Sequence, residues 1–276
     1  MLASPATRLI AVDIGNTLMK RGIFDGAGGV RTAASARRPK LPKPESSIEC
    51  PTQAGVDLLL ADLSDEPALW FVASVHGPTA RNLEEAIRQR RTADSFHLMS
   101  YRDVPLDIRV ERPERVGLDR LAAAAGANHV RRPNRPAIVV DIGTAITVDA
   151  LDASGAFLGG AILPGPGLSA RALHEHTDQL PLIDAGPGSD SVPPIGTSTE
   201  AAMRSGLFYG ALGGVRELIR HMTTALGGRP QVLLSGGYAR LLAPRLGRNV
   251  RYVPHLVLAG IALCAAHART ADGAEG

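Results

Sequence analysis

Two acidic residues, each followed by a short glycine-containing turn, are the first candidates for chemistry in this sequence. Asp13 lies in IAVDIGNTLMK and Asp141 lies in IVVDIGTAITV, each after an apolar run. The two segments align without a gap at a separation of 128 residues, about half of the 276-residue chain. A turn after a strand exposes N–H groups to phosphate oxygens, and an acid there can hold a metal ion that neutralises phosphate charge. One copy is typical of an ordinary hairpin, but two aligned copies favour a nucleotide site built by two related halves.

A second candidate is Asp119-Arg120 in VGLDR, directly before an alanine-rich apolar stretch. An acid within hydrogen-bond reach of a substrate hydroxyl can accept its proton, and a guanidinium can hold a carboxylate through two parallel bonds. The structural alternative is an acid at a helix N-terminus next to a surface arginine. The duplicated turn favours the catalytic interpretation.

Other motifs are weaker. No GxxxxGK[ST] phosphate loop is present, and GPGLSA (165–170) matches only a relaxed dinucleotide pattern. Pro164 and Pro166 remove amide donors from that loop, so a structural turn is favoured. His174 and His176 suggest a metal, but their spacing on a helix points them to different faces.

The elements that must position these residues follow one scheme twice. In the first half we expect strands near 8–14, 18–24 and 28–35, a proline-rich loop, a helix near 53–62, a strand at 68–74, a helix near 79–91 and a strand at 95–99. In the second half we expect strands near 137–142, 146–151 and 156–163, helices near 168–175 and 199–223, a strand at 232–235, a helix at 238–246, a strand at 249–253 and a last helix. Glycines interrupt the long helix, which predicts close helix packing. The sequence predicts an α/β protein of two domains, 1–132 and 133–276.

Composition sets the protein class. The net charge of +3 does not imply nucleic-acid binding, and the two cysteines form no disulfide framework, so a reducing cytoplasm is expected. No signal peptide is visible, and the apolar run 256–266 is too short to span a bilayer. We therefore expect a cytoplasmic protein with no membrane partner.

The chain resembles the type III pantothenate kinases of the acetate and sugar kinase/Hsp70/actin superfamily. The matching segments, in order, are DIGNT (13–17) with Lys20, VGLDR (116–120), DIGTAITVD (141–149), GGAILPG (159–165), STEAAMRSGLFYG (198–210) and LSGGYA (234–239). The resemblance covers nearly the whole chain. It implies duplicated actin-like (RNase H-like) domains, each a mixed sheet with helices. It also implies ATP-dependent phosphorylation of pantothenate to 4'-phosphopantothenate, the first step of coenzyme A biosynthesis.

The resemblance further implies roles for individual residues. Asp119 would be the catalytic base, and Asp141 would hold a monovalent cation, potassium or ammonium. LSGGYA would pass close to the adenosine, and a homodimer and magnesium with ATP are implied as well. The ATP-binding residues would be Asp13, Ile14, Gly15, Asn16, Thr17, Leu18, Met19, Lys20 and Thr144. The pantothenate-binding residues would be Gly117, Leu118, Asp119, Arg120 and Thr199.

One departure from the family pattern bears on the substrate. The family commonly has a tyrosine seven residues before the glycine of GxDR, and here that position is Val110. Two alternatives follow: a related small-molecule kinase with an altered substrate, and a non-catalytic nucleotide-binding regulator. The presence of Asp13, Lys20, Asp119 and Asp141 favours the enzyme over the regulator.

Overall fold

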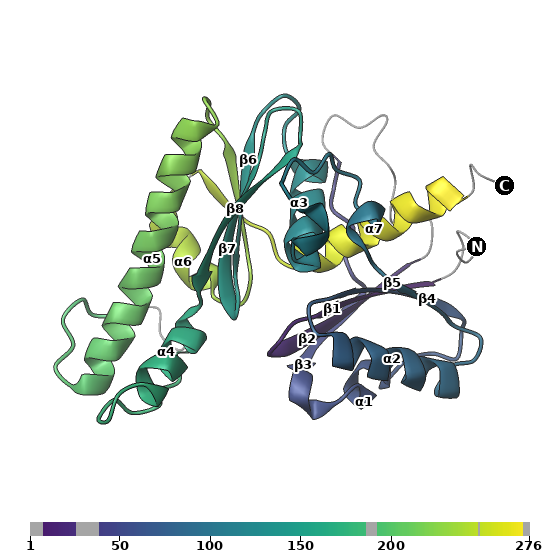
Figure 1. Ribbon diagram of the computed structural model, residues 1–276, viewed down its shortest axis with the longest axis horizontal. Coiled ribbons are helices and arrows are strands. Elements are labelled where there is room, and N and C mark those ends of the chain that lie inside the picture. Colours follow the sequence, from purple (N-terminus) through teal and green to yellow (C-terminus); the bar gives the residue numbers. More distant parts are fainter. Residues whose placement is uncertain (1–7, 26–38, 186–191, 248, 273–276) are drawn as a thin grey trace. The chain divides into compact units, whose positions relative to one another are not determined.

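A computed structural model of the chain describes residues 8–25, 39–185, 192–247 and 249–272 (Figure 1). The chain divides into two compact units, the first formed by Met1–Arg132 with His255–Gly276 and the second by Pro133–Pro254. The break after residue 132 coincides with the expected domain boundary, but the C-terminal residues join the first unit rather than the second. The physical reason is the apolar helix α7 (Leu256–Asp272), which packs against α3 (Leu118–Val130) and β1 (Arg8–Ile14).

The first unit contains a five-stranded mixed sheet with the order β3-β2-β1-β4-β5. Its other strands are β2 (Leu18–Phe24), β3 (Ser46–Pro51), β4 (Ala68–Ser74) and β5 (Ser95–Leu98). β2 pairs antiparallel with β1 and β3, whereas β4 runs parallel to β1 and β5. The strand expected at 28–35 lies outside the described residues. The strand that pairs with β2 comes from the end of the segment expected to be a proline-rich loop.

The second unit repeats this topology with the order β10-β9-β6-β7-β8. Its strands are β6 (Ala137–Ile142), β7 (Ala145–Leu151), β8 (Phe157–Pro164), β9 (Gln231–Ser235) and β10 (Val250–Tyr252). Each strand has a counterpart of the same direction in the first unit. The duplicated actin-like α/β fold expected from the sequence is therefore confirmed.

The helices lie close to their expected positions. They are α1 (Asp57–Leu60), α2 (Gly77–Arg90), α3, α4 (Pro166–Glu175), α5 (Thr199–Ala225), α6 (Ala239–Leu246) and α7, with short 3-10 turns at Thr52–Ala54, Tyr101–Asp103 and Pro113–Arg115. The long helix α5 begins at a clear capping signal, because the Ser198 side chain accepts a hydrogen bond from the Ala201 amide. Each unit has its own apolar core, formed on the α1/α2 side of the first sheet and under α5 and α6 in the second.

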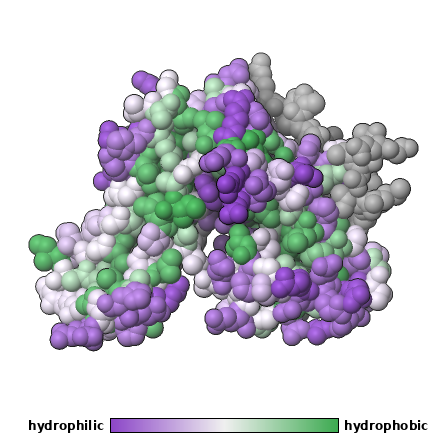
Figure 2. Space-filling model, in the orientation of Figure 1, coloured by the Kyte–Doolittle hydropathy of each residue, from purple (hydrophilic) through white to green (hydrophobic). Residues whose placement is uncertain are grey.

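The glycines of α5 do not all serve packing within the chain. A Cβ at Gly214 would lie 3.1 Å from Leu163 Cδ2, so this glycine allows close approach to β8. A Cβ at Gly206, Gly210 or Gly213 would meet no described atom within 4 Å. The expected close packing therefore holds for Gly214 but not for the other three. On the face drawn in Figure 2, hydrophobic residues reach the surface of the second unit beside α5.

The two faces of the first sheet differ in what covers them. Ile10, Val12 and Ile14 of β1 point toward the core on the α1/α2 side. Asp13, one residue out of step, points to the opposite face because side chains alternate along a strand. Its cross-strand partner Lys20 shares that face with Gly22, where a Cβ would lie 3.2 Å from Leu258 of α7. The face carrying these two charged side chains is thus the one covered by α7.

Helices α3 and α7 approach each other closely at two glycines. A Cβ at Gly260 would lie only 1.8 Å from the carbonyl oxygen of Ala122, and one at Gly126 would lie 2.8 Å from Leu256 Cδ1. A larger residue at Gly260 requires a helix to move, whereas at Gly126 the nearest obstacle is the end of a side chain, with the Leu256 carbonyl oxygen at 3.0 Å. This contact fixes α3, whose first turn contains Asp119, against the helix that covers the sheet.

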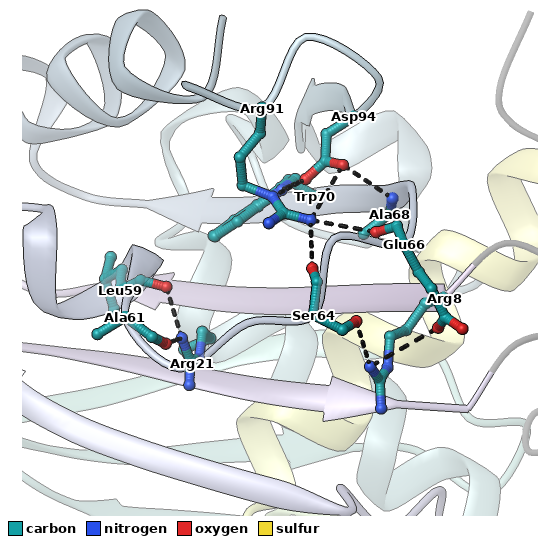
Figure 3. Close-up of polar contacts among 10 residues, drawn as sticks. All are labelled: Arg8, Arg21, Leu59, Ala61, Ser64, Glu66, Ala68, Trp70, Arg91 and Asp94. Atoms are coloured by element: carbon teal, nitrogen blue, oxygen red, sulfur yellow. Dashed lines mark hydrogen bonds and ion pairs between the residues drawn. The ribbon is translucent and has the colours of Figure 1, made fainter. Parts of the chain in front are cut away.

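Arginines anchor the segment 59–66 on the other side of the same sheet (Figure 3). The buried Arg21 side chain on β2 donates through Nη1 to the carbonyls of Leu59 and Ala61, both at 2.7 Å. Arg91 donates through Nη2 to the carbonyls of Ser64 and Glu66 at 3.0 and 3.1 Å. The carbonyls of Ala61, Ser64 and Glu66 lie outside regular structure and are satisfied by these bonds, and the Arg21 bonds tie β2, the strand of Lys20, to this segment.

Candidate active site

The first glycine turn joins β1 to β2. The Gly15 amide donates to the Leu18 carbonyl at 3.0 Å, and a Cβ at Gly15 would lie 2.9 Å from that oxygen, so the turn requires glycine. The Thr52 hydroxyl donates to the Gly15 carbonyl at 2.9 Å, and its amide donates to the Thr17 carbonyl at 2.9 Å. With the turn held in this way, Asn16 and Thr17 are exposed at its tip.

The second turn joins β6 to β7 and is held differently. The Gly143 amide donates to the Ala145 carbonyl at 3.0 Å, and the Gly165 amide donates to the Thr144 carbonyl at 2.9 Å. A Cβ at Gly165 would lie 2.2 Å from the Gly143 carbonyl oxygen, so the glycine of GPGLSA is needed for close approach. Its amide is already engaged by this turn, which supports the structural interpretation of that motif over a pyrophosphate loop.

The strand registers correct the ungapped alignment of the two halves. Asp13 pairs with Lys20 across β1 and β2, whereas Asp141 pairs with Thr147 across β6 and β7. The first turn is therefore one residue longer than the second. By strand register, the position of Lys20 in the first unit corresponds to Thr147 in the second. Thr147 carries no charge, so only the first unit has a cation opposite its strand-end aspartate.

The expected ATP-binding residues of the first unit differ in exposure. Asp13 and Lys20 are half-buried, and Lys20 Nζ lies 3.5 Å from Glu49 Oε2. The side chains of Ile14 and Met19 are fully buried in the core, so a contact with ATP from those two positions would come from the main chain. The Leu18 side chain is half-buried.

Asp119 lies in the first turn of α3, after the N-cap Gly117. Its Oδ1 accepts a hydrogen bond from the Arg120 amide at 2.9 Å. A Cβ at Gly117 would lie 2.5 Å from the same oxygen, so the carboxylate folds back over the glycine and only glycine leaves room for it. A carboxylate in this position can accept the proton of a hydroxyl that is held within hydrogen-bond reach.

The structure places the expected substrate residues in different units. Gly117, Leu118, Asp119 and Arg120 lie together at the start of α3 and are half-buried, as is Val110 just before them. Thr199 is exposed at the first residue of α5 in the second unit. It borders an apolar groove between α4 and α5 together with Ser169 and Thr177.

The turn after β9 lies next to the second glycine turn. Gly236 has a positive φ of 96°, and a Cβ there would lie within 2.4–2.6 Å of the Ile142 backbone. The Tyr238 amide donates to the Ile142 carbonyl at 3.2 Å. Since β6 and β9 are parallel neighbours, the ends of both strands place Asp141 and the Gly236-Gly237 turn side by side.

A cavity of about 320 Å³ opens beside this turn, within the second unit. Its walls are mainly apolar and include Leu207, Phe208 and Ala211 of α5 and Leu241 and Leu242 of α6. Such a cavity, adjacent to a phosphate-type turn, suits a flat apolar ring system that carries a few polar atoms.

The residues suit hard cations with oxygen ligands. Asp141 Oδ2 lies 3.6 Å from the position of a Cβ on Gly143, so the half-buried carboxylate stands over the turn. In the part of the chain that the structure describes, no group of three or more His, Cys, Asp or Glu side chains is placed to hold a metal ion. Single carboxylates at the strand ends fit an ion held jointly with phosphate oxygens. His174 instead contacts the Leu180 carbonyl at 2.8 Å through Nδ1.

Sequence reasoning missed the segment after β4. The Val75 amide donates to the Ile14 carbonyl at 3.0 Å, as the Tyr238 amide does to Ile142 in the other unit. The signal was present, because the apolar strands ending in Ser74 and Ser235 are each followed by a glycine-containing turn. His76 in this segment caps α2 by accepting from the Thr79 amide through its side chain.

Comparison with known proteins gives the same assignment at two levels. The duplicated fold and the paired acidic turns define an actin-like phosphotransferase that uses ATP. The sequence profile described as type III pantothenate kinase matches residues 9–221, and the chain belongs to this family. It is 34% identical to the type III pantothenate kinase of one strain of Dehalococcoides mccartyi, over 92% of this chain and 95% of that protein.

A second relative belongs to the same family, and a solved structure shares the fold. The chain is 35% identical to the type III pantothenate kinase of Legionella pneumophila strain Corby, over 93% of this chain and 98% of that protein. The ethanolamine utilization protein EutJ from Carboxydothermus hydrogenoformans has a similar fold, with a TM-score of 0.50 and 13% identity over 95% of this chain and 90% of EutJ. None of the helices in the described ranges is long and apolar enough to cross a membrane.

Proposed function

We propose that this chain, as a type III pantothenate kinase, transfers the terminal phosphoryl group of ATP to the primary hydroxyl of pantothenate. The product, 4'-phosphopantothenate, enters coenzyme A biosynthesis. The observation that carries the proposal is that Asp119 begins a helix packed on α7, the helix that covers the sheet face of Asp13 and Lys20. A proton acceptor and the groups for phosphate binding thus belong to one rigid unit.

Asp119 acts as the general base. Its ionised carboxylate accepts the proton of the attacking hydroxyl, while Arg120 holds the pantothenate carboxylate. Gly117, Leu118 and Thr199 complete the pantothenate site. Since phosphoryl transfer passes through a loose transition state, these residues act mainly by orienting the hydroxyl in line with the transferred group.

The glycine turns bind the phosphates. Asp13 through Lys20 of the first unit bind ATP, with N–H groups of Asn16 and Thr17 and the Lys20 ammonium directed at phosphate oxygens, and Thr144 of the second unit contributes as well. Asp13 at the strand end would hold the magnesium that accompanies ATP, and that ion would neutralise charge on the phosphates. Asp141 would hold a monovalent cation, potassium or ammonium. The apolar cavity beside Gly236 takes the adenine ring.

The pantothenate site lacks the ring that a tyrosine at position 110 would supply. Loss of one hydrogen bond to a neutral group costs about 0.5–1.5 kcal/mol, which is up to roughly tenfold in affinity. Because Arg120 and Thr199 still hold the polar groups, pantothenate remains the substrate with a modestly raised KM.

The chain works as a cytoplasmic homodimer. Support for a dimer comes from α5, where Gly206, Gly210 and Gly213 present a flat surface with open space above it. Leu158 and Ile162 of β8 are large exposed apolar side chains in the same unit. A second copy of the chain would cover such a surface. The two buried free cysteines agree with a reducing compartment.

A coupled ADP-release assay tests the function. Wild type is offered pantothenate, pantetheine and several sugars, with and without potassium. We expect turnover with pantothenate, and for Asp119→Asn we expect a loss in kcat of roughly 10²–10⁴ with ATP binding retained. Glu84→Ala, on the exposed surface of α2, is the control variant. Phosphorylation of another alcohol in preference to pantothenate would overturn the substrate, and normal turnover by Asp119→Asn would overturn the base.

A further inference from the structure

The tip of the first glycine turn is flanked by two carbonyls that both accept hydrogen bonds from one residue of a distant segment. That residue is Thr52, the first of the 3-10 turn after β3, and only 7% of its surface is exposed. Its hydroxyl donates to the Gly15 carbonyl and its amide donates to the Thr17 carbonyl, each at 2.9 Å. Thr52 therefore holds the chain on both sides of Asn16.

These two hydrogen bonds determine where an amide of the turn points. The peptide bonds of the described residues are all trans, so each carbonyl and the N–H that follows it point in opposite directions. Because the Gly15 carbonyl is directed at the Thr52 hydroxyl, the Asn16 N–H is directed away from that hydroxyl. Within the described ranges the Asn16 amide donates to no other group. This N–H can therefore donate to an oxygen atom of a ligand.

The glycine of the turn cannot keep this peptide in one orientation by itself. A Cβ at Gly15 would lie 2.9 Å from the Leu18 carbonyl oxygen, so the turn requires glycine. Glycine also tolerates more backbone conformations than any other residue. If the Gly15–Asn16 peptide turned over, a carbonyl oxygen with partial negative charge would face the phosphate in place of an N–H group. The Thr52 hydroxyl opposes this rotation, because the rotated carbonyl would lose its donor.

The second glycine turn is held by a main-chain donor instead. The Gly165 amide donates to the Thr144 carbonyl at 2.9 Å, and a change of side chain leaves such a donor in place. The first turn, by contrast, depends on a hydroxyl that a single substitution removes. The contribution of this hydroxyl can therefore be measured separately.

We propose that Thr52 is a positioning residue for the phosphates of ATP, because its hydroxyl holds the Gly15–Asn16 peptide with the N–H toward the phosphate oxygens. The proposal rests on the proposed function in one respect, since it takes the first glycine turn as a phosphate site. It goes further by assigning the orientation of that site to a residue outside the turn. Thr52 acts through Gly15 rather than on the ligand itself.

Calorimetric titration of the full chain with inorganic tripolyphosphate, ATP and adenosine tests the proposal in the absence of pantothenate. Thr52→Val has nearly the shape of the wild-type side chain and keeps the amide bond, but it lacks the hydroxyl. We expect its dissociation constants for tripolyphosphate and ATP to rise by about threefold to tenfold, the worth of one neutral hydrogen bond. Adenosine should bind as in wild type. Thr52→Ser keeps the hydroxyl and should restore both constants.

Steady-state kinetics add a measurement that a merely structural residue would not change in this way. In the ADP-release assay, Thr52→Val should raise the KM for ATP by the same factor and leave kcat within a few-fold. Thr223→Val is the matched control, because it removes a hydroxyl that donates to the Ile219 carbonyl at 2.7 Å within α5. Its affinities and KM values should equal those of wild type.

Hydrogen exchange followed by NMR tests the orientation of the peptide without any substitution. In isotope-labelled wild type, addition of tripolyphosphate should slow exchange of the Asn16 amide, because this N–H would then donate to a phosphate oxygen. Circular dichroism and thermal unfolding establish that each variant is folded. If Thr52→Val does not fold, Thr52→Ser and the exchange of the Asn16 amide still decide the question.

The outcomes separate this proposal from the proposed function. Wild-type affinity of Thr52→Val for tripolyphosphate, equal weakening in Thr52→Val and Thr52→Ser, or unchanged exchange of the Asn16 amide would each overturn the role of Thr52. A wild type that binds no tripolyphosphate would overturn it as well, while turnover of pantothenate is judged independently. Binding of tripolyphosphate that depends on the hydroxyl, in a protein that does not phosphorylate pantothenate, would support the role of Thr52 and refute the proposed substrate.

Discussion

Replacement of Gly260 by alanine tests whether the contact between α3 and α7 holds the catalytic base in place. The new Cβ would lie 1.8 Å from the Ala122 carbonyl oxygen, whereas real Cβ atoms essentially never come within 3.0 Å of a neighbour. The two atoms must therefore separate by about 1.2 Å, the difference between these distances. Because the obstacle is main chain, no side-chain rotation relieves it, and one helix must move.

The cost follows from this displacement. Overpacking of a buried contact destabilises by about 1–3 kcal/mol, and a rigid main-chain obstacle places Gly260→Ala near the upper limit. The higher helix propensity of alanine offsets about 1 kcal/mol. We expect the free energy of unfolding of the first unit to fall by about 2 kcal/mol. At about 2–4 °C for each kcal/mol, its Tm should fall by about 4–8 °C. Asp119 lies one turn before Ala122 on α3, and a shift of about 1 Å at a reacting group costs up to roughly 10²-fold in rate.

Thermal unfolding and the ADP-release assay measure both effects. Gly260→Ala should show a lower Tm and a kcat reduced by about tenfold to a hundredfold, with the KM for ATP within a few-fold of wild type. His267→Ala, at an exposed position of the same helix, is the matched control and should change neither quantity appreciably. An alanine variant with wild-type Tm and kcat would refute the reasoning, because the helices could then separate without cost.

Three further predictions concern other residues. Replacement of potassium by sodium should lower wild-type activity, and Asp141→Ala should abolish this difference; a wild type indifferent to the cation in the ADP-release assay would leave Asp141 as a turn residue. Val110→Tyr should lower the KM for pantothenate by up to about tenfold and leave kcat within a few-fold, the signature of uniform binding. An unchanged KM in steady-state kinetics would show that a tyrosine ring at position 110 does not contact pantothenate. Burial acts to raise the pKa of Asp103, but hydrogen bonds from His97 and Ser100 outweigh it and lower this pKa below its usual value. The stabilisation is therefore present above the unfolded pKa of about 3.9 and lost as pH falls through the folded pKa, so Asp103→Asn should destabilise by about 1.5–3 kcal/mol at pH 7. In denaturant titrations over a pH series the difference should vanish in acid, and a pH-independent difference would contradict this account.

Much of the fold could be predicted because local patterns determine it. Apolar runs with alternating or helical periodicity identified nearly all of the strands and helices, and the duplicated Asp-Ile-Gly segments indicated two related sheets. The acidic residues at strand ends could also be placed from the sequence, because a turn must follow each strand. The position of Asp119 at a helix start followed from the alanine-rich stretch after it.

The remainder depends on contacts between distant segments. The location of α7 could not be predicted, since an apolar helix packs equally well on either sheet until Gly126 and Gly260 are known to lie opposite backbone atoms. The longer first turn was concealed by an alignment without gaps, and only the strand registers reveal it.

Because α7 packs in the first unit, the order in which the two units can fold during translation is constrained. The first unit is interrupted in sequence, so its last helix emerges only after all of the second unit has been made. Until then the alanine face of α3 has no partner, and the sheet face that bears Asp13 and Lys20 is uncovered. The second unit is continuous and can fold as soon as it leaves the exit tunnel, ahead of the part of the chain that precedes it. We therefore expect the second unit to complete its fold before the first, the reverse of the usual order from the N-terminus.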